Sequence, residues 1–203
     1  MKEHRSTDIV ALWTMEEPRT LYSCPVLTLE KRPGHSPISD KHVDFCILRV
    51  PDWVNVIPIT PQGNVVLVRQ FRAGTNELSL EIPGGMVDHR DSNPGDAAAR
   101  ELIEETGYAS ETVSFLGTVT PNPALQDNLC HSYLAWDVTK VSQPNLDPGE
   151  EIQVTEVPLS QIPDLIREGQ IKHALVLAAF AWLLGYGDVD TVLHRLAEIV
   201  DSR

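Results

Sequence analysis

The stretch Arg100-Glu101-Leu102-Ile103-Glu104-Glu105-Thr106-Gly107 decides the fold. Residues 104 and 105 follow residue 101 by three and four positions, so a helix would place their carboxylates on one face. Like charges at this spacing repel by roughly 0.2–0.5 kcal/mol per pair. Two interpretations remain open from these residues alone. One is a solvated acidic face with Arg100 paired to Glu104, and the other is a site for a hard divalent cation such as Mg²⁺.

The flanking residues predict where this helix begins and ends. Asn93 is suited to cap it, Pro94 fits the first turn, and Asp96 lies near the positive end of the helix dipole. Gly107 is the expected residue just beyond its end. A short strand over residues 77–82 and the turn Pro83-Gly84-Gly85 precede the helix, which indicates a strand–loop–helix unit.

The rest of the sequence predicts strands followed by helices. Residues 1–20 are expected to form a loosely held arm. Pro33-Gly34 is expected to break the first two strands into a hairpin with a long loop. The other elements do not alternate strictly, so a mixed sheet is predicted. The expected strands are 24–30, 42–50, 55–60, 64–70, 112–119, 131–137 and 152–158, and the expected helices are 159–168, 172–184 and 189–200.

Composition excludes several classes of protein. The chain of 203 residues is long enough for one domain with a small appendage, and its 42% hydrophobic residues exclude general disorder. A net charge of −13 argues against a nucleic acid polymer as partner. Cys24, Cys46 and Cys130 show no CxxC spacing, and no apolar leader or membrane-length stretch is present. A cytoplasmic protein without a membrane partner is expected.

Residues 85–108 resemble the Nudix box. The second half, Arg100-Glu-Leu-Ile-Glu-Glu-Thr-Gly-Tyr108, matches that pattern completely. Upstream, Asp91 stands where glutamate is usual, and the following spacer is one residue longer. Further motifs over residues 43–185 resemble the branch of ADP-ribose and nucleoside diphosphate sugar pyrophosphatases. They include Leu80-Glu81-Ile82-Pro83-Gly84-Gly85, Pro121-Asn122-Pro123-Ala124 and Gly169-Gln170-Ile171-Lys172-His173-Ala174.

The resemblance implies an α/β (α+β) fold, namely a Nudix α/β/α sandwich with a mixed β-sheet, plus an N-terminal antiparallel β-segment. It implies hydrolysis of the pyrophosphate bond of ADP-ribose or a related nucleoside diphosphate sugar, giving a nucleoside monophosphate and a sugar phosphate. Mg²⁺ is the implied cofactor, with Mn²⁺ as a substitute. The alternatives are a dinucleoside polyphosphate or nucleoside triphosphate pyrophosphohydrolase, and a catalytically silent Nudix-fold binding module.

The resemblance also assigns roles to individual residues. Glu104 is assigned to metal binding and to catalysis. The general base is expected from Glu150 or Glu151. The implied metal ligands are Glu101, Glu104, Glu105, Glu150 and the carbonyl of Gly84.

The substrate is expected to meet residues from several segments. Arg72 is expected to bind a phosphate, because a guanidinium can bind two oxygens at once. Glu81 is expected to support Arg72 or a metal-bound water, and a purely structural role is the alternative. Trp53 or Tyr22 is a candidate for stacking on the base, and Pro123 matches the branch's proline. His173 is interpreted as a capping or packing residue.

An isologous homodimer is a further implication of the resemblance. Residues 1–50 would form a dimerisation segment and residues 51–203 the Nudix hydrolase domain. Trp13, Tyr22, Phe45 and Trp53 would then lie partly in the interface. The alternative is that the N-terminal hairpin folds back on its own domain.

Overall fold

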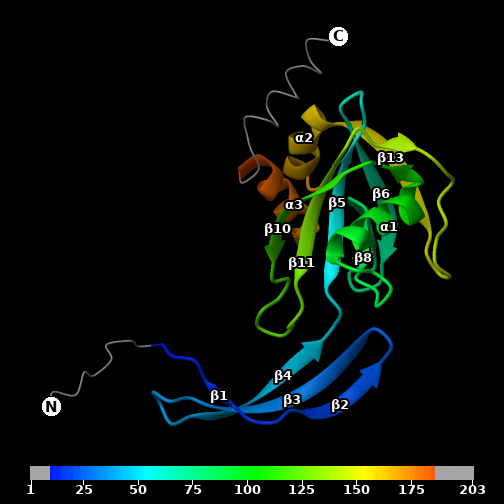
Figure 1. Cartoon of the computed structure of the whole chain (residues 1–203). Coiled ribbons are helices and arrows are strands. Elements are labelled where there is room, and N and C mark those ends of the chain that lie inside the picture. Colours follow the sequence, from blue (N-terminus) through cyan, green and yellow to red (C-terminus); the bar gives the residue numbers. More distant parts are fainter. Residues whose placement is uncertain (1–9, 186–203) are drawn as a thin grey trace. The chain divides into compact units, whose positions relative to one another are not determined.

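A computed structural model of the chain describes residues 10–185. Within this range the chain forms two compact units. The N-terminal unit holds residues 10–51 together with 122–128, and the C-terminal unit holds residues 52–121 and 129–185. Each unit has its own sheet (Figure 1).

The N-terminal unit is an antiparallel sheet built around one long strand, β3 (Leu27–His35). One edge of β3 pairs with β4 (His42–Arg49) along its length, from Thr28↔Arg49 to His35↔His42. The other edge pairs first with β2 (Arg19–Cys24) and then with the short β1 (Thr14–Met15). The predicted N-terminal antiparallel segment is therefore present.

The details of this sheet differ from the expectation. β3 continues through Pro33-Gly34, so the turn that joins it to β4 is much shorter than the predicted loop 31–41. The carbonyl of Pro33 accepts a hydrogen bond from Glu16 N at 2.9 Å, on the edge where pairing passes from β2 to β1. The missing N–H of Pro33 therefore does not interrupt the hydrogen bonds between β3 and its neighbouring strands. The expected loose arm is wrong for residues 14–15 and 19–20, which lie in strands.

Segment 122–128 joins the N-terminal unit although it lies far along the chain. Leu48 N donates to Leu125 O at 2.7 Å, and Leu48 forms a parallel bridge with Gln126. Arg49 adds an ion pair with Asp127. These contacts fix the segment that contains Pro123 to the end of β4.

The C-terminal unit contains a mixed seven-stranded sheet. Five of its strands lie in the order β10-β11-β5-β6-β13. In addition, β7 pairs with β6, and β8 pairs with β5. β5 and β11 are parallel and the other pairs are antiparallel. β9 (Tyr108–Ala109) and β12 (Thr139–Lys140) form a separate pair. The sheet strands are β5 (Trp53–Ile59), β6 (Asn64–Arg72), β7 (Glu77–Glu81), β8 (Gly84–Met86), β10 (Val113–Val119), β11 (Cys130–Trp136) and β13 (Ile152–Pro158).

Helices cover both faces of this sheet, which gives the predicted α/β/α sandwich (Figure 1). Val54 and Val56 of β5 pack toward α1 (Pro94–Thr106), and Ile57 and Ile59 pack toward α3 (Ala174–Gly185). The expected helix 159–168 consists of a 3₁₀ turn, Leu159–Gln161, followed by α2 (Ile162–Arg167). The expected helix 189–200 lies outside the described residues.

Helix α1 begins and ends where the sequence predicts. The side chain of Asn93 accepts hydrogen bonds from Gly95 N and Asp96 N, and Pro94 is the first helical residue. Gly107 ends the helix with φ of 75°, and a Cβ there would lie 2.2 Å from Ser142 O. Between these ends, Ala97, Ala98 and Leu102 pack against Val54 and Val56 of β5. Within residues 10–185, no helix is long and apolar enough to cross a membrane.

Candidate metal and substrate site

The glycine turn before α1 meets the helix at two of its carboxylates. Gly84 pairs with Asn55 of β5, and its N–H donates to Glu105 Oε2 at 2.9 Å. A Cβ on Gly84 would lie 2.3 Å from Val54 O, and one on Gly85 would lie 2.5 Å from Glu101 Oε1. Only glycines allow this approach, which packs Glu101 and Glu105 against the turn.

Burial gives these two carboxyl groups unusual acidities. Glu105 is only 4% exposed, and its burial raises its pKa to about 8 against the opposing hydrogen bond from Gly84. Burial also raises the pKa of Glu101, although the charge of Arg100 works in the other direction. Glu104 is more exposed, with 38% of its side-chain surface accessible. The three glutamates are hereafter called the carboxylate cluster; Glu105 is buried, and Glu101 and Glu104 are partly buried.

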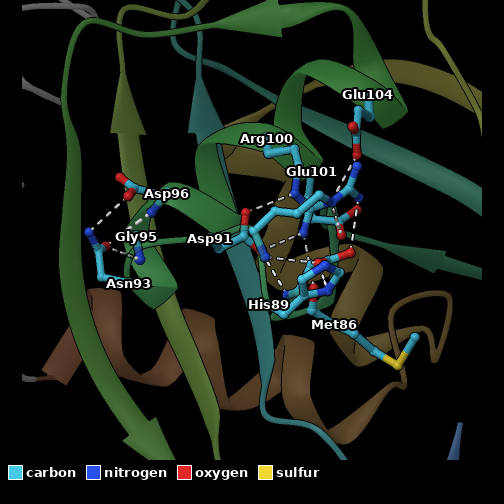
Figure 2. Close-up of polar contacts among 11 residues, drawn as sticks. Met86, His89, Asp91, Asn93, Gly95, Asp96, Arg100, Glu101 and Glu104 are labelled. Atoms are coloured by element: carbon cyan, nitrogen blue, oxygen red, sulfur yellow. Dashed lines mark hydrogen bonds and ion pairs between the residues drawn. The ribbon is translucent and has the colours of Figure 1, made fainter.

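Arg100 links the cluster to the loop before the helix (Figure 2). Its Nη1 donates to Glu101 Oε1 at 2.8 Å and to Glu104 Oε2 at 2.9 Å. Its Nη2 donates to Met86 O at 3.0 Å, so the guanidinium also ties down β8. The ion pair between Arg100 and Glu104 that a solvated face would show is thus present. The same arginine, however, also holds a buried carboxylate, which makes it an orienting residue.

Asp91, the departure from the Nudix pattern, keeps a contact with Arg100. Its two carboxylate oxygens accept from Nε at 3.0 Å and from Nη2 at 2.9 Å of that guanidinium. The hydrogen bonds from Arg100 hold the pKa of Asp91 below its ordinary value. Asp88 N also donates to Asp91 Oδ2 at 2.8 Å, which fixes the longer loop. Asp91, which has a shorter side chain than glutamate and is followed by a longer spacer, therefore forms a bidentate ion pair with Arg100.

The close approach at Gly85 leads to a testable expectation. Gly85→Ala is expected to displace Glu101, because its Cβ would overlap that carboxylate in the present arrangement. We expect divalent-cation affinity to fall by at least about tenfold, the lower end of what disturbed metal-ligand support costs. Isothermal titration with Mn²⁺ measures this. Gly74→Ala is the control, because a Cβ at Gly74 meets no heavy atom within 4 Å. Unchanged affinity in Gly85→Ala would contradict the assignment of Glu101.

A cleft of about 430 Å³ opens beside the glycine turn. Arg72, at the end of β6, forms a bidentate ion pair in it with Glu81 of β7, with Nε–Oε1 at 2.8 Å and Nη2–Oε2 at 2.7 Å. Burial raises the pKa of Glu81, but the hydrogen bonds and charge of Arg72, with contributions from His173 and Ser79, together hold the pKa below its ordinary value. The predicted support of Arg72 by Glu81 is present as a contact. Residues lining the cleft include Trp53, Arg72, Glu81, Gly84, Gly85 and His173.

The loop before β13 brings one of the two candidate bases toward the cluster. The negative charge of Glu150 contributes to the raised pKa values of both Glu101 and Glu105. Glu150 is exposed, and its Oε2 accepts a hydrogen bond from Asp147 N at 3.1 Å. Glu151 is also exposed, and its charge is not among the leading causes of either shift in pKa. The structure thus favours Glu150 over its neighbour, and the role itself stays a prediction.

Two cleft residues carry polar atoms that the sequence reasoning did not assign to the site. Asn55 Oδ1 and His173 Nδ1 are buried and have no hydrogen-bond partner among the described residues. The backbone carbonyl of His173, rather than its ring, accepts from Val176 N and Leu177 N at the start of α3. Unpaired buried groups that line a cleft are suited to bind a polar ligand.

The remaining predicted residues fall in different places. Trp53 lines the cleft at the start of β5. Tyr22 is an exposed residue of β2, and Pro123 lies in segment 122–128, so both belong to the N-terminal unit. The substrate contacts predicted for Trp53, Tyr22 and Pro123 stay predictions.

Comparison with known protein families decides the classification. The family described as NUDIX domain matches residues 51–180, which is more than half of the chain. The chain belongs to the Nudix family. The predicted family is therefore confirmed, and the matched range contains the whole carboxylate cluster, the glycine turn and the cleft.

Curated Nudix relatives act on nucleotide-linked substrates by name. An ADP-ribose pyrophosphatase of Bacillus subtilis is 29% identical over 138 residues, which are 68% of this chain and 74% of the relative. A GDP-mannose pyrophosphatase of Cronobacter sakazakii is 30% identical over 119 residues, covering 55% and 61% of the two chains.

A solved structure confirms the fold. The crystal structure of an ADP compounds hydrolase matches with a TM-score of 0.76 and 22% sequence identity, covering 89% of this chain and 99% of that chain. The predicted Nudix sandwich with a mixed sheet is thus correct.

Proposed function

We propose that this Nudix protein hydrolyses the pyrophosphate bond of ADP-ribose or a related nucleoside diphosphate sugar. The products would be a nucleoside monophosphate and a sugar phosphate. The observation that carries the proposal is the pair Glu101 and Glu105, packed against a glycine turn that lines the same cleft as the Arg72–Glu81 ion pair. Relatives named for ADP-ribose and GDP-mannose hydrolysis support this substrate class.

The carboxylate cluster fits a divalent cation such as Mg²⁺. The charges of Glu101 and Glu150 contribute to the raised pKa of Glu105, and those of Glu104 and Glu150 to the raised pKa of Glu101; a bound cation relieves this repulsion. All the offered donors are oxygens, the type that Mg²⁺ prefers, and Mn²⁺ would accept the same set. The residues that would hold the cation are Glu101, Glu104, Glu105, Glu150 and the carbonyl of Gly84. When bound, the cation neutralises phosphate oxygens and lowers the pKa of a coordinated water.

The protein's own side chains would orient the substrate and move the proton. Glu81 accepts hydrogen bonds from Nε and Nη2 of Arg72. We therefore propose that Nη1 of Arg72 donates to a phosphate oxygen of the substrate. Trp53 at the edge of the cleft is assigned to the base or sugar. The charge of Glu150 contributes to the raised pKa of Glu105 in the carboxylate cluster. We assign Glu150 to accept the proton of the attacking water. Glu104, held by Arg100, would keep the cluster charged and aligned.

A panel of nucleotides tests the proposal. Phosphate released by a coupling phosphatase would be measured for ADP-ribose, GDP-mannose, UDP-glucose, a diadenosine polyphosphate and a nucleoside triphosphate, each with Mg²⁺. We expect the highest kcat/KM for a nucleoside diphosphate sugar. A higher value for the polyphosphate or the triphosphate would favour the alternative pyrophosphohydrolase. Binding without turnover across the panel would favour a silent binding module.

The acidity of Glu105 predicts how the cation stabilises the fold. Its pKa of about 8 lies above the ordinary 4.5, so the folded state favours the protonated form and metal-free stability falls as pH rises between these values. A cation bound to the carboxylate removes this loss. We therefore expect Mg²⁺ to raise Tm more at about pH 9 than at about pH 6. Thermal melts with and without Mg²⁺ measure this, and equal shifts at both pH values would contradict it.

A homodimer through the N-terminal segment is also proposed. The N-terminal unit exposes Leu21, Tyr22 and Val43, which is typical of a surface that another chain covers. Trp13 and Phe45 pack on each other inside the unit, with ring centroids 5.2 Å apart, so they support the sheet from within. A small sheet of this kind needs something to pack on.

The dimer has a direct test. Light scattering at micromolar concentration is expected to give twice the chain mass of 22.5 kDa. Deleting residues 1–50 is expected to leave a poorly soluble, inactive chain, even though every residue of the carboxylate cluster remains. A mass near 22.5 kDa for the full chain, or a soluble and active truncated chain, would refute the role of this segment.

A further inference from the structure

A second group of metal-ligating side chains lies in the N-terminal unit, at the turn that joins β3 to β4. His35 and His42 are directly opposite each other on these strands, and their rings stack with centroids 4.5 Å apart and planes 29° apart. Asp40 lies in the turn between them, and its Oδ1 is 3.0 Å from His35 Nε2. Two imidazoles and one carboxylate thus converge without any contribution from the carboxylate cluster.

The turn holds Asp40 in a specific backbone conformation. Asp40 has φ of 53°, a left-handed conformation that few residues other than glycine adopt. Ser36 N donates to Lys41 O at 2.9 Å across the base of the turn. The buried Ser36 hydroxyl accepts from Ile38 N at 3.3 Å and Ser39 N at 3.2 Å. These bonds keep the carboxylate on the same side as the two rings.

The geometry points to a site for a borderline divalent metal ion of the Zn²⁺ type, held by His35, Asp40 and His42. One ligand atom from each residue lies within 4.8 Å of the others. A tetrahedral site with bonds of about 2.0–2.1 Å places its ligands roughly 3.3 Å apart. The separation of His35 Nε2 and Asp40 Oδ1 is already close to that value, and rotation of the exposed His42 side chain would supply the rest.

The donor chemistry separates this site from the carboxylate cluster. Imidazole suits Zn²⁺, Cu²⁺ and Ni²⁺, whereas Mg²⁺ selects oxygen ligands. A carboxylate and two imidazoles, each offering one ligand atom, make a mixed oxygen and nitrogen donor set of the kind that Zn²⁺ binds. A bound ion would take the place of the proton between His35 and Asp40 and tie together the end of the β3–β4 hairpin.

Zinc titration of the full, untagged chain in excess Mg²⁺ tests the site. The excess Mg²⁺ is added to occupy the carboxylate cluster, as the proposed function requires, so that calorimetry reports the histidine site. His42→Ala and Asp40→Asn are each expected to weaken Zn²⁺ binding by at least about tenfold, because losing mere support of a ligand already costs that much. Asparagine tolerates the left-handed conformation, so Asp40→Asn keeps the turn. His89→Ala is the matched control, because His89 is an exposed histidine that pairs with a single carboxylate, Asp88.

Electron paramagnetic resonance with Cu²⁺ gives a readout that does not depend on affinity. We expect nitrogen coupling from two imidazoles in the wild type and in His89→Ala, and from one imidazole in His42→Ala. Circular dichroism would confirm that each variant is folded. The site would be refuted if the wild type binds no Zn²⁺ in excess Mg²⁺. It would equally be refuted if His42→Ala and Asp40→Asn bind Zn²⁺ as tightly as the wild type.

Discussion

Glu105→Gln is expected to lower kcat/KM for a nucleoside diphosphate sugar by at least about 100-fold, or about 2.7 kcal/mol of transition-state stabilisation. The amide oxygen of glutamine can still accept the hydrogen bond from Gly84 N, so the turn should keep its contact with α1. The substitution removes a negative charge that a divalent cation would bind. Steady-state kinetics with Mg²⁺ measures the loss.

Stability distinguishes this effect from simple misfolding. Burial raises the pKa of Glu105 to about 8, so its charge opposes folding at high pH in the metal-free protein. We therefore expect metal-free Glu105→Gln to melt no lower than the wild type above about pH 8. Glu111→Gln, at an exposed position outside the site, is the matched control for loss of one acidic charge. Activity of Glu105→Gln within about threefold of the wild type would contradict the metal role.

Glu150→Gln is expected to lower kcat by at least about 100-fold with little change in KM, since general bases contribute roughly 10²–10⁴-fold. The charge of Glu150 acts on Glu101, Glu105 and Arg72, which places it near both the cluster and the cleft. A glutamine keeps the size of the side chain but cannot take a proton. Comparing kcat with KM separates this loss from weaker substrate binding.

The neighbouring residue supplies the control for this substitution. Glu151→Gln removes the same charge one position along the same exposed loop, and we expect a much smaller effect on kcat. The pH profile adds a second criterion, because loss of a general base removes the acidic limb of kcat. If Glu151→Gln abolishes turnover and Glu150→Gln does not, the assignment of the base to Glu150 is wrong.

Local sequence signals predicted α1 well. Asn93 and Gly107 determine the two ends of the helix through bonds to residues a few positions away, and Pro94 suits the first position because it lacks an N–H. The spacing of the three glutamates then follows from helix geometry alone. The same local reasoning failed at Pro33, because the effect of a proline on a strand depends on which edge needs its N–H.

Other parts of the site depend on contacts between distant segments. Asn55 and His173 lie more than a hundred residues apart, and only the packing of α3 against β5 brings both to the cleft. His173 lies in the motif of residues 169–174, but that motif does not predict that a buried polar atom of its ring would be unpaired. The contact between Asp91 and Arg100 likewise depends on how the longer loop folds back on the helix.

The central claim is that α1 and the glycine turn hold a divalent cation that drives cleavage of a pyrophosphate bond. The most direct test incubates the full chain with ADP-ribose and identifies the products with Mg²⁺, with a chelator, and in Glu105→Gln. The proposal predicts AMP and ribose 5-phosphate with Mg²⁺, and almost no product in the other two cases. Equal product formation with and without the chelator would contradict the claim, as would full activity in Glu105→Gln.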